Sequence, residues 1–170
     1  MKEVSFRNDI LPLKDTLYRL ALRITLNNAE AEDIVQDTLL KVWNRRDDWH
    51  EMENIEAYSM TVCRNLALDR IARADNRTAS IDDKGIERPD TATSPLELAS
   101  QRDHIAIVRR LIDSLPEKQR SCIQLRDIEG RTYKEIAQVL GISEEQVKVN
   151  IFRARQTIKL KFQEYDNYGL

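Results

Sequence analysis

The sequence predicts an all-α fold of two small helical domains joined by a flexible linker. Apolar residues recur at helical spacing over residues 10–74 and again over 104–162. Four glycines and four prolines are too few for the many turns of an all-β fold. Residues 75–103 are rich in Asp, Ser, Thr and Pro and lose this periodicity. We therefore expect an N-terminal helical bundle over residues 1–74, the linker over 75–103 and a C-terminal helix-turn-helix domain over 104–170.

Three helices are expected in the N-terminal domain, over residues 10–26, 29–47 and 55–74. One of the two asparagines at 27–28 can cap the second helix, because an asparagine side chain accepts a hydrogen bond from a free backbone N–H. Residues 50–54 are polar and aperiodic, and we expect them to form a loop.

The second of these helices has two different faces. The buried stripe is expected to comprise Ala31, Ile34, Val35, Thr38, Leu39, Val42 and Arg46, with Trp43 and Trp49 closing its far end. The opposite face carries Asp33, Gln36, Asp37 and Leu40. Such a face is either solvated surface or a docking surface for the basic helix of a partner.

The third helix presents Arg64, Asn65, Asp69, Arg70 and Arg73 on one side. Arginines beside a loop and an aromatic residue are typical of nucleic-acid contacts, since phosphates pair with arginine and bases stack on aromatic rings. This pattern alone is a weak indication. The acidic stretch that follows is either a simple tether or a mimic of nucleic acid inside a basic channel.

The C-terminal domain begins with helices expected over residues 103–114 and 117–127. Two capping boxes follow, Thr132 with Glu135 and Ser143 with Gln146, and each predicts the start of a helix. Gly141 lies between them and can end the first helix in the left-handed conformation. Two helices joined by so short a turn are typical of a DNA-binding helix-turn-helix. The tail after residue 162 is expected to fray.

The second helix of this pair has one apolar face and one mixed face. Basic residues lie on it and just beyond it, where they could neutralise phosphates or contact base edges: Lys148, Arg153, Arg155, Lys159 and Lys161. An ordinary helical hairpin with a solvated basic surface is the alternative. The basic residues favour DNA binding over that alternative.

Composition limits the function classes. The net charge is −2 and the pI is about 5.8, which predicts weak DNA binding by the chain alone and a larger partner. No apolar run reaches the roughly 20 residues of a membrane span, and no signal peptide is present, so we expect a cytoplasmic protein. Cys63 and Cys122 lie in helical patterns and are expected to be buried apolar residues. No metal, cofactor or catalytic residue set is expected.

Three motifs resemble the extracytoplasmic-function (ECF) sigma factors of the sigma-70 family. They are AEAEDIVQDTLLKVW (29–43), AYSMTVCRNLALDRIAR (57–73), and LIDSLPEKQRSCIQLRDIEGRTYKEIAQVLGIS (111–143) followed by IFRAR (151–155). The resemblance spans nearly the whole chain, with the motifs in the family's order. It implies a two-domain subunit, not an enzyme by itself, that binds core RNA polymerase and recognises and helps to melt promoter DNA. An inhibitory anti-sigma partner is a further expectation from the family.

The resemblance also implies roles for individual residues. Polymerase binding falls on Asp33, Gln36, Asp37 and Leu40. Capture of a flipped base of the −10 element is assigned to Trp49, His50, Glu51, Met52, Glu53 and Asn54, together with Tyr58 and Asn65. Arg64, Arg70 and Arg73 would hold the DNA backbone beside that base. Recognition of the −35 element falls on Glu145, Lys148, Val149, Phe152, Arg153 and Arg155. The linker would thread the polymerase channel.

The chain departs from the family at a few of these positions. The family commonly has Gly-Thr where this chain has Glu145 and Gln146, and a basic or small residue where it has Val149 and Asn150. Tyr58 stands where tryptophan is frequent. A known promoter sequence therefore does not transfer to this chain. A freestanding regulator with a dimerising or sensing N-terminal domain is the second hypothesis, and it would bind a symmetric operator tightly without polymerase. A helical adaptor whose arginines are only surface is the third.

Overall fold

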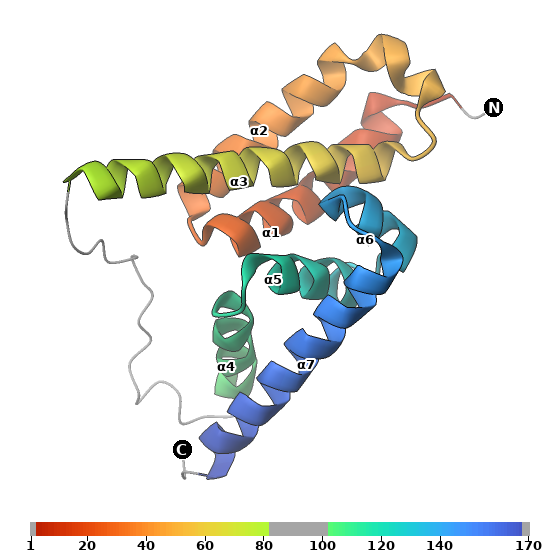
Figure 1. Cartoon of the computed structure of the whole chain (residues 1–170). Coiled ribbons are helices and arrows are strands. Elements are labelled where there is room, and N and C mark those ends of the chain that lie inside the picture. Colours follow the sequence, from red (N-terminus) through yellow and green to blue (C-terminus); the bar gives the residue numbers. More distant parts are fainter. Residues whose placement is uncertain (1–2, 82–101, 168–170) are drawn as a thin grey trace.

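The computed structural model describes residues 3–81 and 102–167, and every regular element in this part is helical (Figure 1). The all-α prediction is confirmed. The N-terminal half contains α1 (Lys14–Thr25), α2 (Asn28–Asn44), η3 (Arg46–Glu51) and α3 (Ile55–Ile81). The C-terminal half contains α4 (Arg102–Asp113), α5 (Glu117–Ile123), η5 (Gln124–Ile128), α6 (Tyr133–Leu140) and α7 (Glu144–Asn167). None of the described helices combines the length and the apolarity that crossing a membrane requires.

The first expected helix forms in three pieces. A π turn at Phe6–Ile10 and a 3₁₀ turn at Leu11–Leu13 precede α1, and Pro12 lies in the 3₁₀ turn. After α1, Leu26 takes a left-handed conformation with φ 57°. The Asn27 side chain then accepts a hydrogen bond from the backbone N–H of Glu30 at 2.9 Å, which caps α2 as expected.

The structure corrects several expected boundaries. Helix α2 ends at residue 44, before the expected end at 47, and Arg46 is exposed with its guanidinium 4.6 Å from the centre of the Trp43 ring. Its predicted place in the buried stripe is wrong, because the chain turns into η3. Helix α3 continues to 81 instead of 74, and α7 continues to 167 instead of fraying after 162. Neither extension contains a proline or glycine, so nothing local ends the helix. The rest of the expected linker, 82–101, lies outside the described residues.

The two halves share one hydrophobic core. A single cluster of buried residues runs from Leu17, Leu20 and Met60 in the N-terminal half to Cys122 and Ile136 in the C-terminal half. Helix α1 contacts α5, and α3 contacts α6, so the C-terminal half lies along one side of the N-terminal bundle (Figure 1). Both cysteines are buried as expected, and burial raises the pKa of the Cys63 thiol to about 12. The halves are therefore packed against each other.

Candidate functional site

The helix-turn-helix forms as its capping pattern predicts. The Thr132 hydroxyl accepts from the Glu135 backbone N–H at 3.1 Å, and the Glu135 carboxylate accepts from the Thr132 N–H at 3.1 Å. Ser143 and Gln146 make the same reciprocal pair at 3.1 and 3.0 Å. Gly141 ends α6 with φ 69°, a conformation in which glycine meets no steric cost. Two local hydrogen bonds thus fix the start of α6, and two more fix the start of α7.

Helix α7 buries one face and exposes the other. Val147, Ile151 and Ala154 are buried in the core. On the opposite face two apolar side chains remain in solvent, with Val149 45% and Phe152 63% exposed. Their exposed neighbours on this face are Glu145, Lys148 and Arg153. An exposed face of mixed apolar and charged residues on the second helix of a helix-turn-helix suits contact with base edges and thymine methyl groups.

The basic side chains of α7 differ in the contacts that they make with the rest of the protein. Within the described part of the chain, no ion pair involves Arg153. The ammonium of Lys148 lies 5.3 Å from the centre of the Tyr133 ring. Arg155 pairs with Asp127 of η5, with Nε 3.1 Å from a carboxylate oxygen, and this pairing raises the pKa of its guanidinium. Arg155 is therefore the most constrained of the residues assigned to the −35 element.

The residues expected to bind polymerase lie on one side of α2. Asp33, Gln36, Asp37 and Leu40 lie along its outer side, with Leu40 60% exposed. Arg70 of α3 reaches across to this helix and donates to the carboxylates of Glu30 at 2.6 Å, Asp33 at 2.6 Å and Asp37 at 2.9 Å. These hydrogen bonds, first that of Glu30, raise the pKa of Arg70. Arg70 thus links the expected polymerase face to the expected DNA face.

The segment assigned to the −10 element is held by Trp49. Its indole is buried, its Nε1 donates to the Val42 carbonyl at 3.0 Å, and its ring packs with those of Phe6 and Trp43. The expected loop is partly helical, since η3 extends to residue 51. Within the segment His50, Glu51 and Glu53 are exposed, while Met52 and Tyr58 are half-buried and pack against the cluster that contains Trp49. Asn65 and Arg73 are exposed farther along α3, where Arg73 pairs with Asp69 at 2.9 Å.

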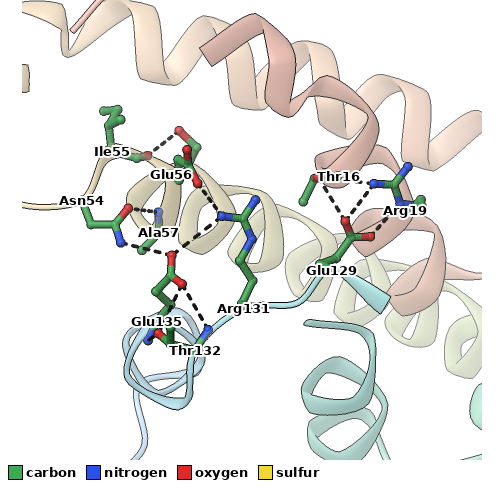
Figure 2. Close-up of polar contacts among 11 residues, drawn as sticks. Thr16, Arg19, Asn54, Ile55, Glu56, Ala57, Glu129, Arg131, Thr132 and Glu135 are labelled. Atoms are coloured by element: carbon green, nitrogen blue, oxygen red, sulfur yellow. Dashed lines mark hydrogen bonds and ion pairs between the residues drawn. The ribbon is translucent and has the colours of Figure 1, made fainter. Parts of the chain in front are cut away.

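Asn54 and the start of α3 contact the start of α6 (Figure 2). The Asn54 side chain accepts from the backbone N–H of Ala57 at 2.9 Å and donates to the Glu135 carboxylate at 3.2 Å. The guanidinium of Arg131 donates to Glu56 and lies 3.8 Å from Glu135. We call these four residues, Asn54, Glu56, Arg131 and Glu135, the α3–α6 contact. Sequence reasoning found Glu135 only as a helix cap.

A second interdomain pair holds Arg64. Its side chain is 7% exposed, and its Nε and Nη2 donate to the Glu117 carboxylate at 3.1 and 2.6 Å. The Ser121 hydroxyl donates to the same carboxylate. Glu117 is 53 residues away in sequence, so no local pattern could indicate this partner. The packed arrangement thus places Arg64, assigned to the DNA backbone, in an internal ion pair.

Glu129 is the third interdomain anchor. Its carboxylate accepts from Arg19 Nε at 2.6 Å and from the Thr16 hydroxyl at 3.1 Å (Figure 2). The Gln124 amide donates to the same carboxylate at 3.0 Å. Arg19 and Thr16 belong to α1, so this contact joins the N-terminal bundle to the turn after η5.

Acid is expected to destabilise the packed arrangement. Burial raises the pKa of Glu129 and of Glu135, but hydrogen bonds, chiefly from Arg19 to Glu129 and from the Thr132 backbone to Glu135, leave each pKa below its ordinary value of 4.5. A carboxyl whose pKa is lower in the folded state stabilises that state above its ordinary pKa, and this contribution is lost as pH falls. The free energy of unfolding from urea titrations should therefore fall below about pH 4.5. The Glu129→Gln/Glu135→Gln variant should show a shallower fall; an identical pH profile would contradict the assignment.

Both halves match known family models. The model described as "Sigma-70 region 2" matches residues 10–77, and "Sigma-70, region 4" matches 105–158. The first match spans α1 to α3, with the segment around Trp49, and the second spans α4 and most of α7. The matched ranges therefore correspond to the two packed halves.

Relatives and solved structures show the same likeness over nearly the whole chain. The chain is 35% identical to the ECF RNA polymerase sigma factor SigL of Mycobacterium tuberculosis, covering 87% of this chain and 83% of SigL. It is 28% identical to the probable RNA polymerase sigma factor RfaY of Xanthomonas campestris, but it spans only 40% of that longer protein. The sigma factor RpoE from Bartonella quintana, solved in complex with the anti-sigma factor NepR, superimposes with a TM-score of 0.78 at 25% identity, over 95% of this chain and 98% of that one.

Proposed function

The chain belongs to the ECF sigma factors of the sigma-70 family, and on that premise we propose that it binds core RNA polymerase and directs initiation at promoters with matching −35 and −10 elements. The observation that carries the proposal is that a region 2 half is joined to a region 4 half, in which α7, the second helix of the helix-turn-helix, exposes Val149 and Phe152. The chain itself would catalyse nothing; RNA synthesis belongs to the polymerase.

The residue roles follow the geometry of each half. Glu145, Lys148, Val149, Phe152 and Arg153 would enter the major groove at the −35 element, with Arg155 beside them. The segment 49–54 with Tyr58, Asn65 and Arg73 would contact the −10 element, joined by Arg64 and Arg70 once their present carboxylate partners are released. The α2 face of Asp33, Gln36, Asp37 and Leu40 would bind core polymerase.

A protein inhibitor is the third partner in this proposal. The RpoE structure contains an anti-sigma factor, and its fold superimposes on nearly the whole of this chain. An inhibitor of this class would cover surfaces that polymerase or DNA needs. Its identity would come from purifying the chain from its native cell with whatever is bound to it.

Transcription with core polymerase tests the proposed function. Core enzyme would be supplied with fragmented genomic DNA, with and without this chain, and the RNA 5′ ends would be sequenced. The proposal requires that the chain joins core and adds a small set of new start sites. Tight binding to a symmetric operator without any affinity for core would instead favour a freestanding regulator.

Replacing Arg153 with alanine is expected to reduce promoter binding by the holoenzyme about 10- to 100-fold, if the guanidinium contacts a base edge, because such a contact is worth about 1–3 kcal/mol. The loss should depend on the base at one −35 position. Equal loss on all sequences, with a salt slope lower by about one, would assign Arg153 to a phosphate instead. Arg109→Ala, which removes an exposed arginine of α4 outside the assigned −35 residues, is the matched control and should change binding little.

A further inference from the structure

The segment assigned to the −10 element packs on a small core of its own. Trp49 lies in a cluster with Ile10 and Val42, and all three side chains are buried. Among the described residues, this cluster is separate from the core that the two halves share. Met52 and Tyr58, which the proposed function also assigns to the −10 element, pack against the small cluster. The position of the segment therefore depends on the residues that build this cluster.

Side chains that precede α1 complete the cluster. The ring of Phe6 stacks on that of Trp49, with the ring centroids 6.5 Å apart and an angle of 10° between the planes. The same ring meets the Trp43 ring edge-on, with centroids 5.3 Å apart. Ile10 is fully buried in the cluster, and Val4 packs against it. Phe6 is therefore the aromatic residue that joins this N-terminal turn to the −10 segment.

Hydrogen bonds fix both partners of the Phe6–Trp49 stack. The π turn that begins at Phe6 is capped, because the Ser5 hydroxyl accepts from the backbone N–H of Asn8 at 3.3 Å. The backbone N–H of Ser5 in turn donates to the Asp9 carboxylate at 2.7 Å. This turn also contacts α3 (Figure 1). Since the indole of Trp49 is held by its own hydrogen bond, the two rings meet in one defined arrangement.

We infer that Phe6 is a positioning residue for recognition of the −10 element. Its ring fixes Trp49, and Trp49 fixes residues 50–54, so the segment is already ordered when it meets a flipped base. Flipping costs free energy that the pocket must offset, and a pocket that has to be ordered first retains less binding free energy for the base. Phe6 precedes the range 10–77 that the region 2 model matches. The inference rests on the proposed function of the −10 segment.

Base preference of the polymerase-bound chain is the test. Wild type and Phe6→Ala would each be assembled with core enzyme, and fluorescence anisotropy would give the affinity for a single-stranded −10 oligonucleotide from a promoter that the wild type uses. Further oligonucleotides would each carry one replaced base, and the replacement that weakens wild-type binding most identifies the captured base.

Phe6→Ala should bind the promoter sequence about tenfold more weakly than the wild type, equivalent to about 1.4 kcal/mol. It should bind the oligonucleotide that lacks the captured base as the wild type does, because the pocket contributes nothing there. The preference for the captured base should therefore fall about tenfold, while affinity for core enzyme and for the −35 element stays unchanged.

A purely structural role of Phe6 would give a different result. Loss of folded chain lowers the amount of active holoenzyme and weakens the binding of every oligonucleotide by the same factor, so the preference would not change. Equal losses on all oligonucleotides, or a preference as large as that of the wild type, would overturn the inference. Phe6→Tyr keeps the ring and should keep the preference. Phe6→Leu has no ring to stack, should lose part of the preference, and replaces the alanine variant if that one does not fold.

Phe162→Ala is the matched control. Phe162 is also half-buried and also makes an edge-to-face contact, with His104 at 5.5 Å, but it lies in the C-terminal half. Its replacement should leave the preference for the captured base unchanged.

Tryptophan fluorescence reports the contact itself in the free chain, because both tryptophans of the sequence contact Phe6. Phe6→Ala should shift their emission to longer wavelength, with unchanged helical circular dichroism, since water reaches the two indoles. Phe162→Ala should leave the emission as it is. An unshifted spectrum of Phe6→Ala would contradict the inference.

The wild-type measurement separates failure of this inference from failure of the proposed function. A wild-type chain that never joins core, or that binds all oligonucleotides equally when bound to core, would refute the proposed function. A wild-type preference that Phe6→Ala retains in full would refute only the positioning role of Phe6.

Discussion

Replacing Glu117 with alanine should lower the free energy of unfolding by about 3 kcal/mol, the largest stability effect that we expect from a single surface-accessible carboxylate. The guanidinium of Arg64 is 7% exposed and would lose both of its acceptors, leaving a buried charge without a partner. The Ser121 hydroxyl would lose its acceptor as well. Urea unfolding followed by circular dichroism measures this loss.

A double replacement distinguishes the cost of leaving the Arg64 charge buried without a partner from the cost of lost packing. Arg64→Met/Glu117→Met removes both charges, and most of the stability should return, because an apolar pair of similar volume often equals a buried ion pair. Asp48→Ala breaks the exposed Arg45–Asp48 pair, whose side chains are 56% and 46% exposed, and should cost less than about 1 kcal/mol. Equal losses for Glu117→Ala and Asp48→Ala would contradict the buried-charge argument.

Replacing Asp37 with lysine should weaken binding to core polymerase more than about 100-fold, because like charges placed across an interface cost several kcal/mol. The new ammonium would also stand where the Asp37 carboxylate now accepts from Arg70 at 2.9 Å, so it would repel that guanidinium. Affinity would be measured by titrating labelled chain with core enzyme.

Glu32→Lys is the matched control for this change. Glu32 is exposed on the same helix but does not belong to the assigned face, so its reversal should leave core binding within a few-fold of the wild type. Unfolding curves of both variants would show whether loss of the Arg70 pairing alone destabilises the fold. If Asp37→Lys binds core as the wild type does, the α2 face is not the docking surface.

Local hydrogen bonding explains why much of the fold could be predicted from sequence. The caps at Asn27, Thr132 and Ser143 each join residues three apart, so the pattern contains both partners of every bond. The buried face of α7 follows from helical periodicity in the same way. The predicted helix ends at 74 and 162 are too early, because no proline or glycine lies in residues 75–81 or 163–167 and helix propensity alone places an end poorly.

The candidate site could be predicted only in part, for the same physical reason. Exposure of Val149, Phe152 and Leu40 follows from which face of a helix is apolar. The environment of Arg64 does not, since an arginine on a mixed helix face looks solvent-exposed until its partner is known. The family resemblance assigns Arg64 to DNA, and the fold pairs it with Glu117.

The sequence by itself determined the all-α class, the helix-turn-helix and the exposed faces of α2 and α7, because these depend on residues within a few positions of each other. Only the tertiary structure decided that the two halves share one core and that Glu56, Glu117 and Glu129 meet partners 75, 53 and 110 residues away. Ion pairs at such separations form when packed helices bring distant side chains together. Helical periodicity describes one helix at a time and contains no information about that packing.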